Sequence, residues 1–251
     1  MRPSNTTLVE FSSGTRFHIR EEKGGDMDVI REIYLDDAYQ IAKMAYNGFN
    51  PALIIDVGAH IGAFSKKCYE TWPNAKIIAI EPSRRSNELL MANVSKALCF
   101  RRAIGKSSDE LLLIDAYQST GSGFTTSKDR LEYKIAEKRL IDGYTYGTQA
   151  EVIPSHLVCS LEDILGSCPI PDNQPIDLLK LDCEGAEFEI FETISPETAA
   201  RVKRIVGEFH CVEGYDYFLE RAQRAFPHLN FDTNVFPTAK IGLFWTEEVR
   251  S

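Results

Sequence analysis

Short, largely apolar runs alternate with segments of helical periodicity along most of the chain. The runs Leu53–Val57, Lys76–Ile80 and Ile176–Leu181 are rich in apolar residues, which is typical of strands that are buried on both faces. Helical segments follow at Ile61–Tyr69 and Arg84–Lys96, among others. Strands that alternate with helices in this way predict a mainly parallel sheet with helices on both of its faces.

Further elements extend this pattern towards the C-terminus. A third strand is expected near Leu98–Ile104 and another at Arg204–Phe209, with a helix at Ala186–Thr193 between them. The last two runs, Leu229–Phe236 and Ile241–Trp245, follow one another closely and read as an antiparallel pair. The sheet is therefore predicted to end in a departure from the parallel repeat.

Two segments lie outside this alternation. Residues 1–50 form an extension with a strand at Phe17–Arg20 and a helix from Asp28 to Ala45. Residues 115–150 are polar, rich in Gly and Ser, and too long for an ordinary connection. The predicted organisation is an N-terminal extension followed by an α/β domain at residues 51–251, with an insertion at 115–150 that is either a functional lid or a mobile segment.

Composition narrows the class of partner and the compartment. The 251 residues carry a formal net charge of −9, which disfavours nucleic acid and anionic membranes, because both attract clustered Lys and Arg. The six cysteines include no C-x-x-C pair, so reduced thiols are expected rather than a zinc site. No signal-peptide core is visible, and no apolar run reaches the ~20 residues that span a bilayer. We therefore expect a cytoplasmic protein, whose oligomeric state the pattern does not specify.

The first candidate site is a glycine-containing turn, Asp56–Gly62, which follows a predicted strand and opens a helix. Gly58 and Gly62 allow the backbone to turn tightly and to approach a ligand closely, and the helix start offers unpaired N–H groups. A dinucleotide-binding turn would carry Gly in place of Asp56. A carboxylate there would repel a pyrophosphate, but it suits the ammonium group of an amino-acid-bearing cofactor such as S-adenosylmethionine.

An acidic residue, Glu81, follows the second predicted strand and precedes Pro82. A carboxylate at this strand tip is placed to accept hydrogen bonds from both ribose hydroxyls of an adenosine. Taken singly, a glycine turn is often only a turn, and a carboxylate at the end of a strand is often only solvated. In this order and context, the two together indicate a site for a nucleoside-containing cofactor.

The strand Ile176–Leu181 leads into Asp182, at the edge where ligands bind in open α/β sheets. Lys180 lies two residues before Asp182 and therefore shares a face with it. A buried Lys needs a partner, so an ion pair with a neighbouring carboxylate is the simplest interpretation. Glu184 and Glu187 fall in the first turn of the next helix, where the helix dipole favours carboxylates, and capping alone could explain both.

Glu208 and His210 lie at the end of the next predicted strand, again two residues apart and on one face. A carboxylate and an imidazole at a strand tip could activate a substrate hydroxyl as a general base. The alternative interpretation is a structural pair whose hydrogen bonds are satisfied. His60, in the glycine turn, is more typical of a packing or backbone-bonding residue than of a catalyst.

Together these stretches resemble the FkbM-type family of class I S-adenosylmethionine-dependent methyltransferases. The resemblance covers about residues 26–210 and rests on Ile54–Gly62, on Glu81-Pro82 and on Leu179–Glu187. The last stretch is similar to the family signature K-[IL]-D-x-E-G-A-E, with one departure at Cys183, where Val or Ile is commoner. The resemblance implies a Rossmann-like fold with a seven-stranded, mainly parallel sheet, an antiparallel terminal strand and helices on both faces.

The same resemblance implies S-adenosylmethionine as cofactor and a hydroxyl on a sugar or natural-product-like small molecule as methyl acceptor. It implies Asp56, Gly58 and Glu81 as cofactor contacts, with Asp182 at the join between cofactor and acceptor. The [DN]-P-P-[FY] tetrad of many amine methylases is absent after the strand, which favours oxygen over nitrogen. The full predicted cofactor-binding set is Asp56, Val57, Gly58, Ala59, His60, Gly62, Glu81, Pro82, Ala103 and Asp182.

Methyl transfer to a hydroxyl needs a base near the methyl group, because the alcohol loses its proton during attack. The candidates are His210, then Glu208, then Asp182, in that order of preference. A divalent metal held by Asp182 with Glu208 or His210 would be another way to lower the hydroxyl pKa, but no residue is assigned as a metal ligand.

Two other functions are open at this point. Lys180, Asp182 and Glu208 partly resemble the lysine–acid set of ribose 2′-O-methylases that act on RNA, although the negative net charge argues against an RNA substrate. A cofactor-binding module without catalysis is the second alternative. The presence of Asp56, Glu81 and Asp182 makes that alternative less favoured.

Overall fold

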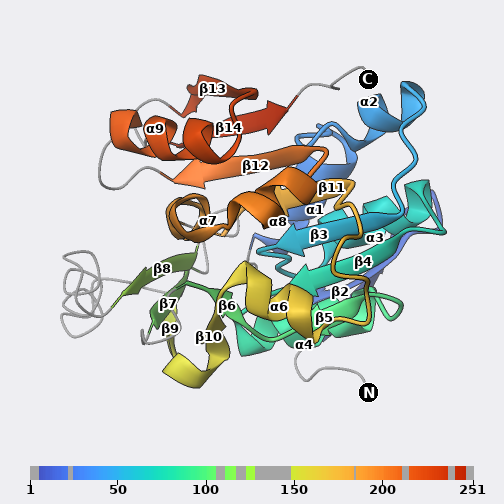
Figure 1. The fold of residues 1–251 in the computed structure, drawn as a ribbon. Helices are drawn as coiled ribbons and strands as arrows, with labels where there is room; N and C mark the ends of the chain where they lie inside the picture. The colour runs from blue at the N-terminus through green and yellow to red at the C-terminus, as the bar shows by residue number, and fades with distance from the viewer. Residues whose placement is uncertain are drawn as a thin grey trace.

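A seven-stranded sheet runs through the middle of the protein (Figure 1). The structure is a computed structural model that describes residues 6–21, 25–105, 111–116, 123–127, 148–183, 185–210, 215–236 and 241–246. From one edge to the other, the strands are β13 (Leu229–Phe236), β14 (Ile241–Thr246), β12 (Ile205–His210), β11 (Leu178–Leu181), β3 (Leu53–Val57), β4 (Lys76–Ile80) and β5 (Leu98–Phe100). Within this sheet β14 is antiparallel to both of its neighbours and the other pairs are parallel. The predicted fold class is confirmed.

Helices cover both faces of this sheet, which is why the central strands are mostly apolar, with Asp56 and Lys180 as charged exceptions. All five residues of β3 and all four of β11 are buried. One face carries α6 (Leu161–Ser167), α7 (Glu187–Thr193), α8 (Pro196–Arg201) and α9 (Tyr215–Ala225). The other face carries α1 (Asp26–Tyr34), α2 (Ile41–Tyr46), α3 (Ala63–Thr71) and α4 (Arg84–Asn93). Burial on both sides is the arrangement that continuous apolar strands require.

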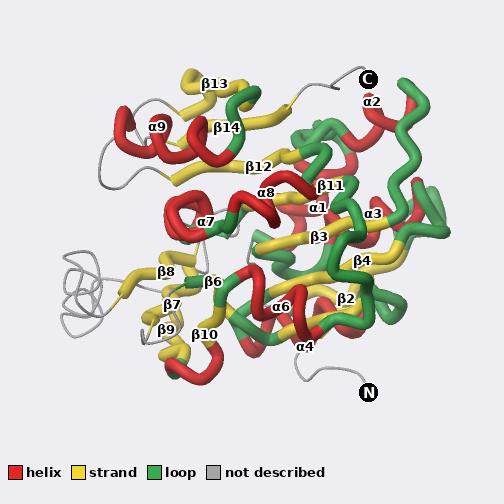
Figure 2. The backbone as a smooth tube through the Cα atoms, in the orientation of Figure 1, coloured by secondary structure: helices red, strands yellow, loops and turns green. Residues whose placement is uncertain are grey.

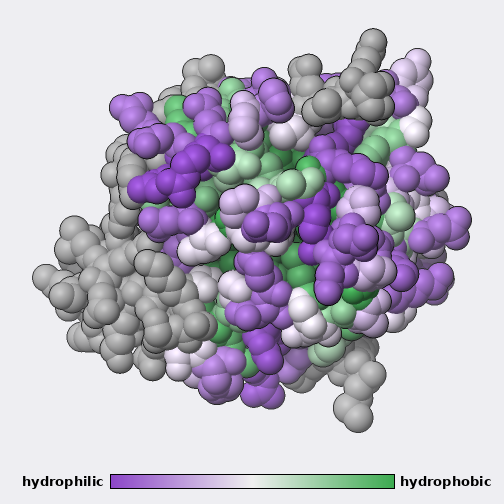
Figure 3. Space-filling view, in the orientation of Figure 1, coloured by the Kyte–Doolittle hydropathy of each residue, from purple (hydrophilic) through white to green (hydrophobic). Residues whose placement is uncertain are grey.

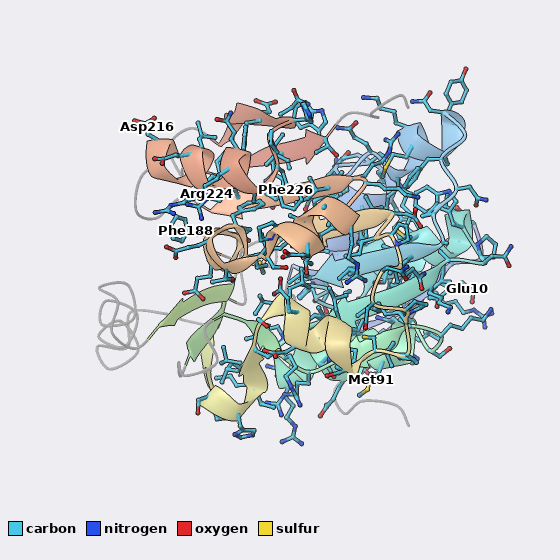
Figure 4. The ribbon with its side chains drawn as sticks, in the orientation of Figure 1. Glu10, Met91, Phe188, Asp216, Arg224 and Phe226 are labelled. Carbon is cyan, nitrogen blue, oxygen red and sulfur yellow. The ribbon has the colours of Figure 1, made fainter. Side chains whose placement is uncertain are left out.

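An aromatic cluster fixes α7, the helix that follows Asp182, against α9 and the terminal strands. Phe191 of α7 lies with its ring centroid 5.6 Å from Phe218, 5.9 Å from Phe226 and 5.5 Å from Phe244, all edge-on. Phe226 is labelled in Figure 4. Edge-to-face rings add directional contacts to the apolar burial, so α7 is held against α9 and the terminal strands by a packed core.

The order of the strands creates a switch point between β3 and β11. From β3 the chain crosses to β4 and then β5 on one side, and later returns to β11 and β12 on the other side. Loops from β3 and β11 therefore leave in opposite directions at the carboxyl edge of the sheet, which opens a crevice there. This edge carries Gly58 and Asp182.

Two sequence predictions need correction. The helix expected from Asp28 to Ala45 is two helices, α1 and α2, because Asp37 (φ 50°) and Gln40 (φ 59°) take left-handed conformations that end helical bonding. The third strand, expected near Leu98–Ile104, stops at Phe100. After Arg101 and Arg102 the chain forms β6 (Ala103–Ile104), which pairs with β10 (Val158–Cys159) in a separate two-stranded sheet.

The predicted lid insertion contains strands. β7 (Leu111–Ala116) pairs antiparallel with β8 (Gly123–Ser127) and with β9 (Thr148–Ile153), and Figure 2 shows these three as a group apart from the main sheet. The expectation of a loop across 115–150 was therefore wrong at these strands, whose backbone pairs with neighbours. The rest of that segment, residues 117–122 and 128–147, lies outside the described residues.

The remaining elements belong to the start of the chain and to the connection after β9. β1 (Thr6–Glu10), which the sequence analysis did not foresee, pairs antiparallel with β2 (Arg16–Arg20), and a short 3₁₀ helix, η1 (Ser155–Leu157), precedes β10. On the face seen in Figure 3, hydrophilic side chains lie over much of the surface, with hydrophobic ones showing between them. None of the described helices is long and apolar enough to cross a bilayer.

Candidate functional site

The site is built where the ends of β3 and β11 touch. Asp182 N–H donates to the Val57 carbonyl at 3.1 Å, and Gly58 N–H donates to the Ile80 carbonyl of β4 at 2.9 Å. Gly58 has φ +75°, and a Cβ on it would lie 1.7 Å from the Asp182 carbonyl oxygen. In this structure Gly58 lies close against the backbone of Asp182, directly after β11, and its predicted close approach to a ligand stays a prediction.

Gly62 serves helix packing. It has φ +87° and precedes α3, and a Cβ there would lie 2.6 Å from Val94 Cγ2 and 2.8 Å from Leu90 Cδ1. Val94 and Leu90 belong to the end of α4, so the absence of a side chain at Gly62 lets α3 start directly against α4. This role needs no ligand.

Lys180 is the central charged residue of the site. Its side chain is 3% exposed, and its Nζ lies 3.3 Å from Asp56 Oδ1 and 3.5 Å from Asp182 Oδ2. It also donates to the carbonyls of Gly58 at 2.7 Å and Val57 at 3.3 Å. The predicted ion pair is confirmed, with two carboxylates in place of one. Burial alone would lower the pKa of Lys180, but the Asp56 and Asp182 carboxylates outweigh it and hold the pKa above its ordinary value.

Asp56 is fully buried beneath the glycine turn. Its Oδ2 accepts a hydrogen bond from Ser65 Oγ at 2.7 Å, and its Oδ1 faces the Lys180 ammonium. Oδ1 has no hydrogen bond among the described residues. In this structure Asp56 is a buried counter-ion of Lys180, and its predicted meeting with a cofactor ammonium stays a prediction.

Glu81 lies at the tip of β4 with its carboxylate oriented by backbone donors. The residue is 7% exposed, and its two oxygens accept from His60 N–H at 2.9 Å and from Ser83 N–H at 2.8 Å. Each carboxylate oxygen can accept more than one hydrogen bond. Glu81 is therefore a fixed acceptor beside the glycine turn, and its contact with a ribose diol stays a prediction.

The N-terminal extension contacts this turn through His60. His60 has φ +49°, a left-handed conformation that is uncommon for a residue with a side chain. Its Nε2 lies 2.5 Å from a terminal nitrogen of Arg20 in β2, and 3.6 Å from Asp26 Oδ1 at the start of α1. Arg20 and Asp26 form a buried ion pair. The interpretation of His60 as a packing residue agrees with these contacts.

Asp182 and Glu208 lie side by side on neighbouring strands. The register pairs Leu181 with Gly207, which places the next residues, Asp182 and Glu208, beside each other. Asp182 is 26% exposed at its side chain and accepts a hydrogen bond from the Tyr39 hydroxyl at 2.9 Å. His210 is the last residue of β12, and its side chain lies outside the described residues.

A small, open hollow lies on the α7 side of the same edge. It is lined by Val57, Gly58, Ile80, Pro82, Arg102, Ala103, Ile104, Cys183 and Ala186. Four of these residues, Val57, Gly58, Pro82 and Ala103, belong to the predicted cofactor set, and the other five were missed.

Most of the missed residues could have been found from their places in the chain. Ile80, Arg102 and Ile104 neighbour predicted residues in sequence, and Cys183 follows Asp182 directly. The loop after Asp182 is shaped by Glu187, which is fully buried and accepts from Cys183 N–H at 2.6 Å and Gly185 N–H at 2.8 Å. Capping of backbone donors thus accounts for Glu187, while Glu184 lies outside the described residues.

A divalent metal held by Asp182 with Glu208 or His210 is an alternative that the sequence left open. Among the residues whose placement the structure describes, no group of three or more His, Cys, Asp or Glu side chains is arranged to hold a metal ion. The described cysteines, Cys68, Cys99, Cys159, Cys168 and Cys183, are free thiols.

Comparisons with known proteins point to one family. The sequence profile described as "Methyltransferase FkbM domain" matches residues 56–229, a span that includes Asp56, Glu81, Asp182 and Glu208. Methyltransferase sdnD of Sordaria araneosa is 31% identical over 194 residues, which cover 72% of this chain and 73% of that protein. Methyltransferase 1 of Beauveria bassiana is 25% identical over 185 residues, which cover 71% of each.

Similarity to solved structures is weak. A SAM-dependent O-methyltransferase from Thermotoga maritima is 13% identical, with a TM-score of 0.42, over 98% of this chain and 78% of that one. The fold assignment itself rests on the strand order given above.

Replacement of Lys180 by Met should strongly destabilise the protein. The variant leaves Asp56 buried without its counter-ion, and breaking a buried pair from one side typically costs about 3–5 kcal/mol. Urea unfolding at neutral pH would measure the loss. Lys203→Met is the matched control, since Lys203 pairs with Asp177 at 2.7 Å but is 58% exposed, where a pair contributes at most about 1 kcal/mol. Equal losses in the two variants would contradict a central role for Lys180.

Replacement of Asp26 by Asn should make stability less dependent on pH in acid. Burial alone would raise the pKa of Asp26, but its bonds to Arg20 outweigh this and leave the pKa below the ordinary 3.8. A depressed pKa in the folded state stabilises the protein above the unfolded-state value and stops doing so as pH falls through the folded-state value. The free energy of unfolding of wild type should therefore exceed that of Asp26→Asn at pH 6, and the gap should narrow below about pH 4. A gap that stays constant down to pH 2.5 would refute this assignment.

Proposed function

The chain belongs to the FkbM methyltransferase family, and from that premise we propose that it methylates a hydroxyl oxygen of a sugar or natural-product-like small molecule. It is an S-adenosylmethionine-dependent methyltransferase; the oxygen acceptor and its class are the proposal. The main observation in support of this proposal is the hollow at the switch point. Its lining includes Cys183, the residue that follows the Asp182 carboxylate at the same edge of the sheet.

The residues around the hollow fit an adenosine-bearing cofactor. Val57, Gly58, Pro82 and Ala103 offer small and apolar surface, and Glu81 offers an oriented carboxylate for a ribose diol. Such a cofactor supplies a methyl group already activated on a positively charged sulfur. The task left to the protein is to align the reactants, which is worth several orders of magnitude in rate.

Asp56 would act on the cofactor through its charge. Its carboxylate is fully buried and paired with Lys180, yet the unit formed by Lys180, Asp56 and Asp182 carries one net negative charge when all three are ionised. A low-dielectric site with a negative charge favours a cationic ligand group. This accords with the proposed affinity for an ammonium and a sulfonium.

The base is proposed to be His210, with Glu208 and then Asp182 as the next candidates. Glu208 and Asp182 are neighbours at the carboxyl edge, and His210 follows on the same strand. Lys180 is not a candidate, because two carboxylates raise its pKa and keep its proton in place. The same argument disfavours a ribose 2′-O-methyltransferase that acts on RNA, because that function would require Lys180 as one of the catalytic residues.

We also propose a cytoplasmic location and a small-molecule partner. The free thiols at the five described cysteine positions suit a reducing compartment. The net charge of −9 disfavours nucleic acid as the acceptor.

A panel of acceptors would test the function directly. We expect S-adenosylhomocysteine release with hydroxylated sugars or polyketide- and terpenoid-type alcohols, and little with matched amines or with RNA oligonucleotides. Release with RNA alone would overturn the small-molecule proposal, and release with amines alone would overturn the oxygen proposal.

Glu81→Ala should weaken binding of S-adenosylhomocysteine by roughly 10- to 100-fold. Hydrogen bonds to a charged group contribute about 1.5–3 kcal/mol, and ~1.4 kcal/mol corresponds to tenfold in affinity. Calorimetry on the folded variant measures the change. Glu88→Ala is the control, because Glu88 forms only an exposed pair with Arg84 on α4. An unchanged affinity in Glu81→Ala would remove Glu81 from the site.

His210→Ala should slow methyl transfer by about 100-fold or more, since it would remove the general base. Binding of S-adenosylhomocysteine should stay within about twofold. Full activity in the variant would exclude His210 as the general base and would point to Glu208 or Asp182 instead. Loss of wild-type activity on addition of a chelator would instead favour a metal.

A further inference from the structure

Tyr39 reaches the functional edge from a distant part of the sequence. It lies in the turn between α1 and α2 of the N-terminal extension, 143 residues before Asp182. Its hydroxyl donates to Asp182 Oδ2 at 2.9 Å, and Lys180 Nζ lies 3.5 Å from the same oxygen. Two donors from different elements thus converge on one oxygen of the Asp182 carboxylate.

The ring of Tyr39 is held in place by its surroundings. The residue is 4% exposed. Phe64 of α3 packs edge-on against the ring at 5.6 Å, and the Lys180 ammonium lies 5.6 Å from the ring centroid. Because packing fixes the ring, the hydroxyl is delivered at a fixed position rather than from a mobile side chain.

The hydroxyl is a permanent donor. Burial raises the pKa of Tyr39 well above its ordinary value, and the charges of Asp182, Glu208 and Glu32 raise it further. A tyrosine that keeps its proton beside a carboxylate donates to it. The three carboxylates named here lie directly after β11, on β12 and on α1, so the extension and the sheet meet at this hydroxyl.

The local backbone also supports a specific purpose for the turn. Asp37 (φ 50°) and Gln40 (φ 59°) flank Tyr39 in left-handed conformations, which are disfavoured for residues with side chains. Asp37 is fixed by accepting from the N–H groups of Ala42 and Lys43 and from the Lys67 ammonium. Such strain persists where surrounding contacts over-determine it, often at functional sites.

We propose that Tyr39 is a positioning residue for Asp182, so that the N-terminal extension completes the methyl-transfer site of the α/β domain. This inference rests on the proposed function in one respect, the place of Asp182 at the join between cofactor and acceptor. Tyr39 acts through Asp182 and contacts neither reactant itself.

Binding of two inert cofactor analogues tests the proposal without any acceptor. S-adenosylhomocysteine lacks the methyl group, and sinefungin carries a protonated amine where the methyl sulfonium would be. A carboxylate fixed near that position makes sinefungin bind more tightly than S-adenosylhomocysteine. The ratio of the two dissociation constants, measured by calorimetry, therefore reports the placement of Asp182.

Tyr39→Phe keeps the ring and removes only the hydroxyl. We expect sinefungin affinity to fall three- to tenfold, while S-adenosylhomocysteine affinity stays within twofold. Tyr34→Phe is the matched control, because Tyr34 also donates to a carboxylate, Glu70, at 2.9 Å, within the same extension. Tyr34→Phe should leave both affinities unchanged.

The double variant separates the possible explanations. Asp182→Asn should abolish the preference for sinefungin, and adding Tyr39→Phe to it should cause no further change, since residues that act through one another are not additive. Equal weakening of both ligands in Tyr39→Phe would mean a purely structural role and would overturn the proposal. An unchanged preference in Asp182→Asn would overturn the placement of Asp182 in the proposed function, and with it this inference.

Discussion

The buried ammonium of Lys180 is the interaction on which the functional edge depends. Removal of one charge from water is costly unless opposite charges and hydrogen bonds replace the hydration. Lys180 meets that requirement with Asp56 from β3, Asp182 after β11, and two carbonyls of the glycine turn. β3, β11 and the glycine turn therefore depend on one another for their positions.

The glycine turn is held from below by Lys180 and from the outside by the N-terminal extension. Arg20 and Asp26 engage His60, whose N–H in turn orients Glu81. Tyr39, which also belongs to the extension, donates a hydrogen bond to Asp182. Rigid support of this kind suits a reaction in which alignment of two reactants is the main contribution of the protein.

The sequence predicted those parts of the structure that depend on local pattern. β3, β4 and β11 were located because apolar runs mark buried strands, and the pairing of Lys180 with Asp182 followed from a spacing of two residues in a strand. The break between α1 and α2 was missed because the left-handed turn around Tyr39 is stabilised by tertiary contacts. Its residues carry no Gly or Pro to signal it.

The parts of the site that were missed share one physical reason. Tyr39 pairs with Asp182 across 143 residues, and Arg102 lines the hollow because the chain leaves the main sheet after Phe100 to pair β6 with β10. Local hydrophobic periodicity predicts neither the Tyr39–Asp182 contact nor the β6–β10 pairing, because both depend on which surfaces meet after folding. The apolar hollow lies on the α7 face and the charged residues on the face of α1 to α3, and the two meet at Asp182. Asp182 is held by Lys180 and Tyr39 on one face of the sheet, while the next residue, Cys183, lines the hollow on the other. The loop that follows β11 therefore connects the charged cluster to the hollow, which is the position that a residue joining two ligands would need.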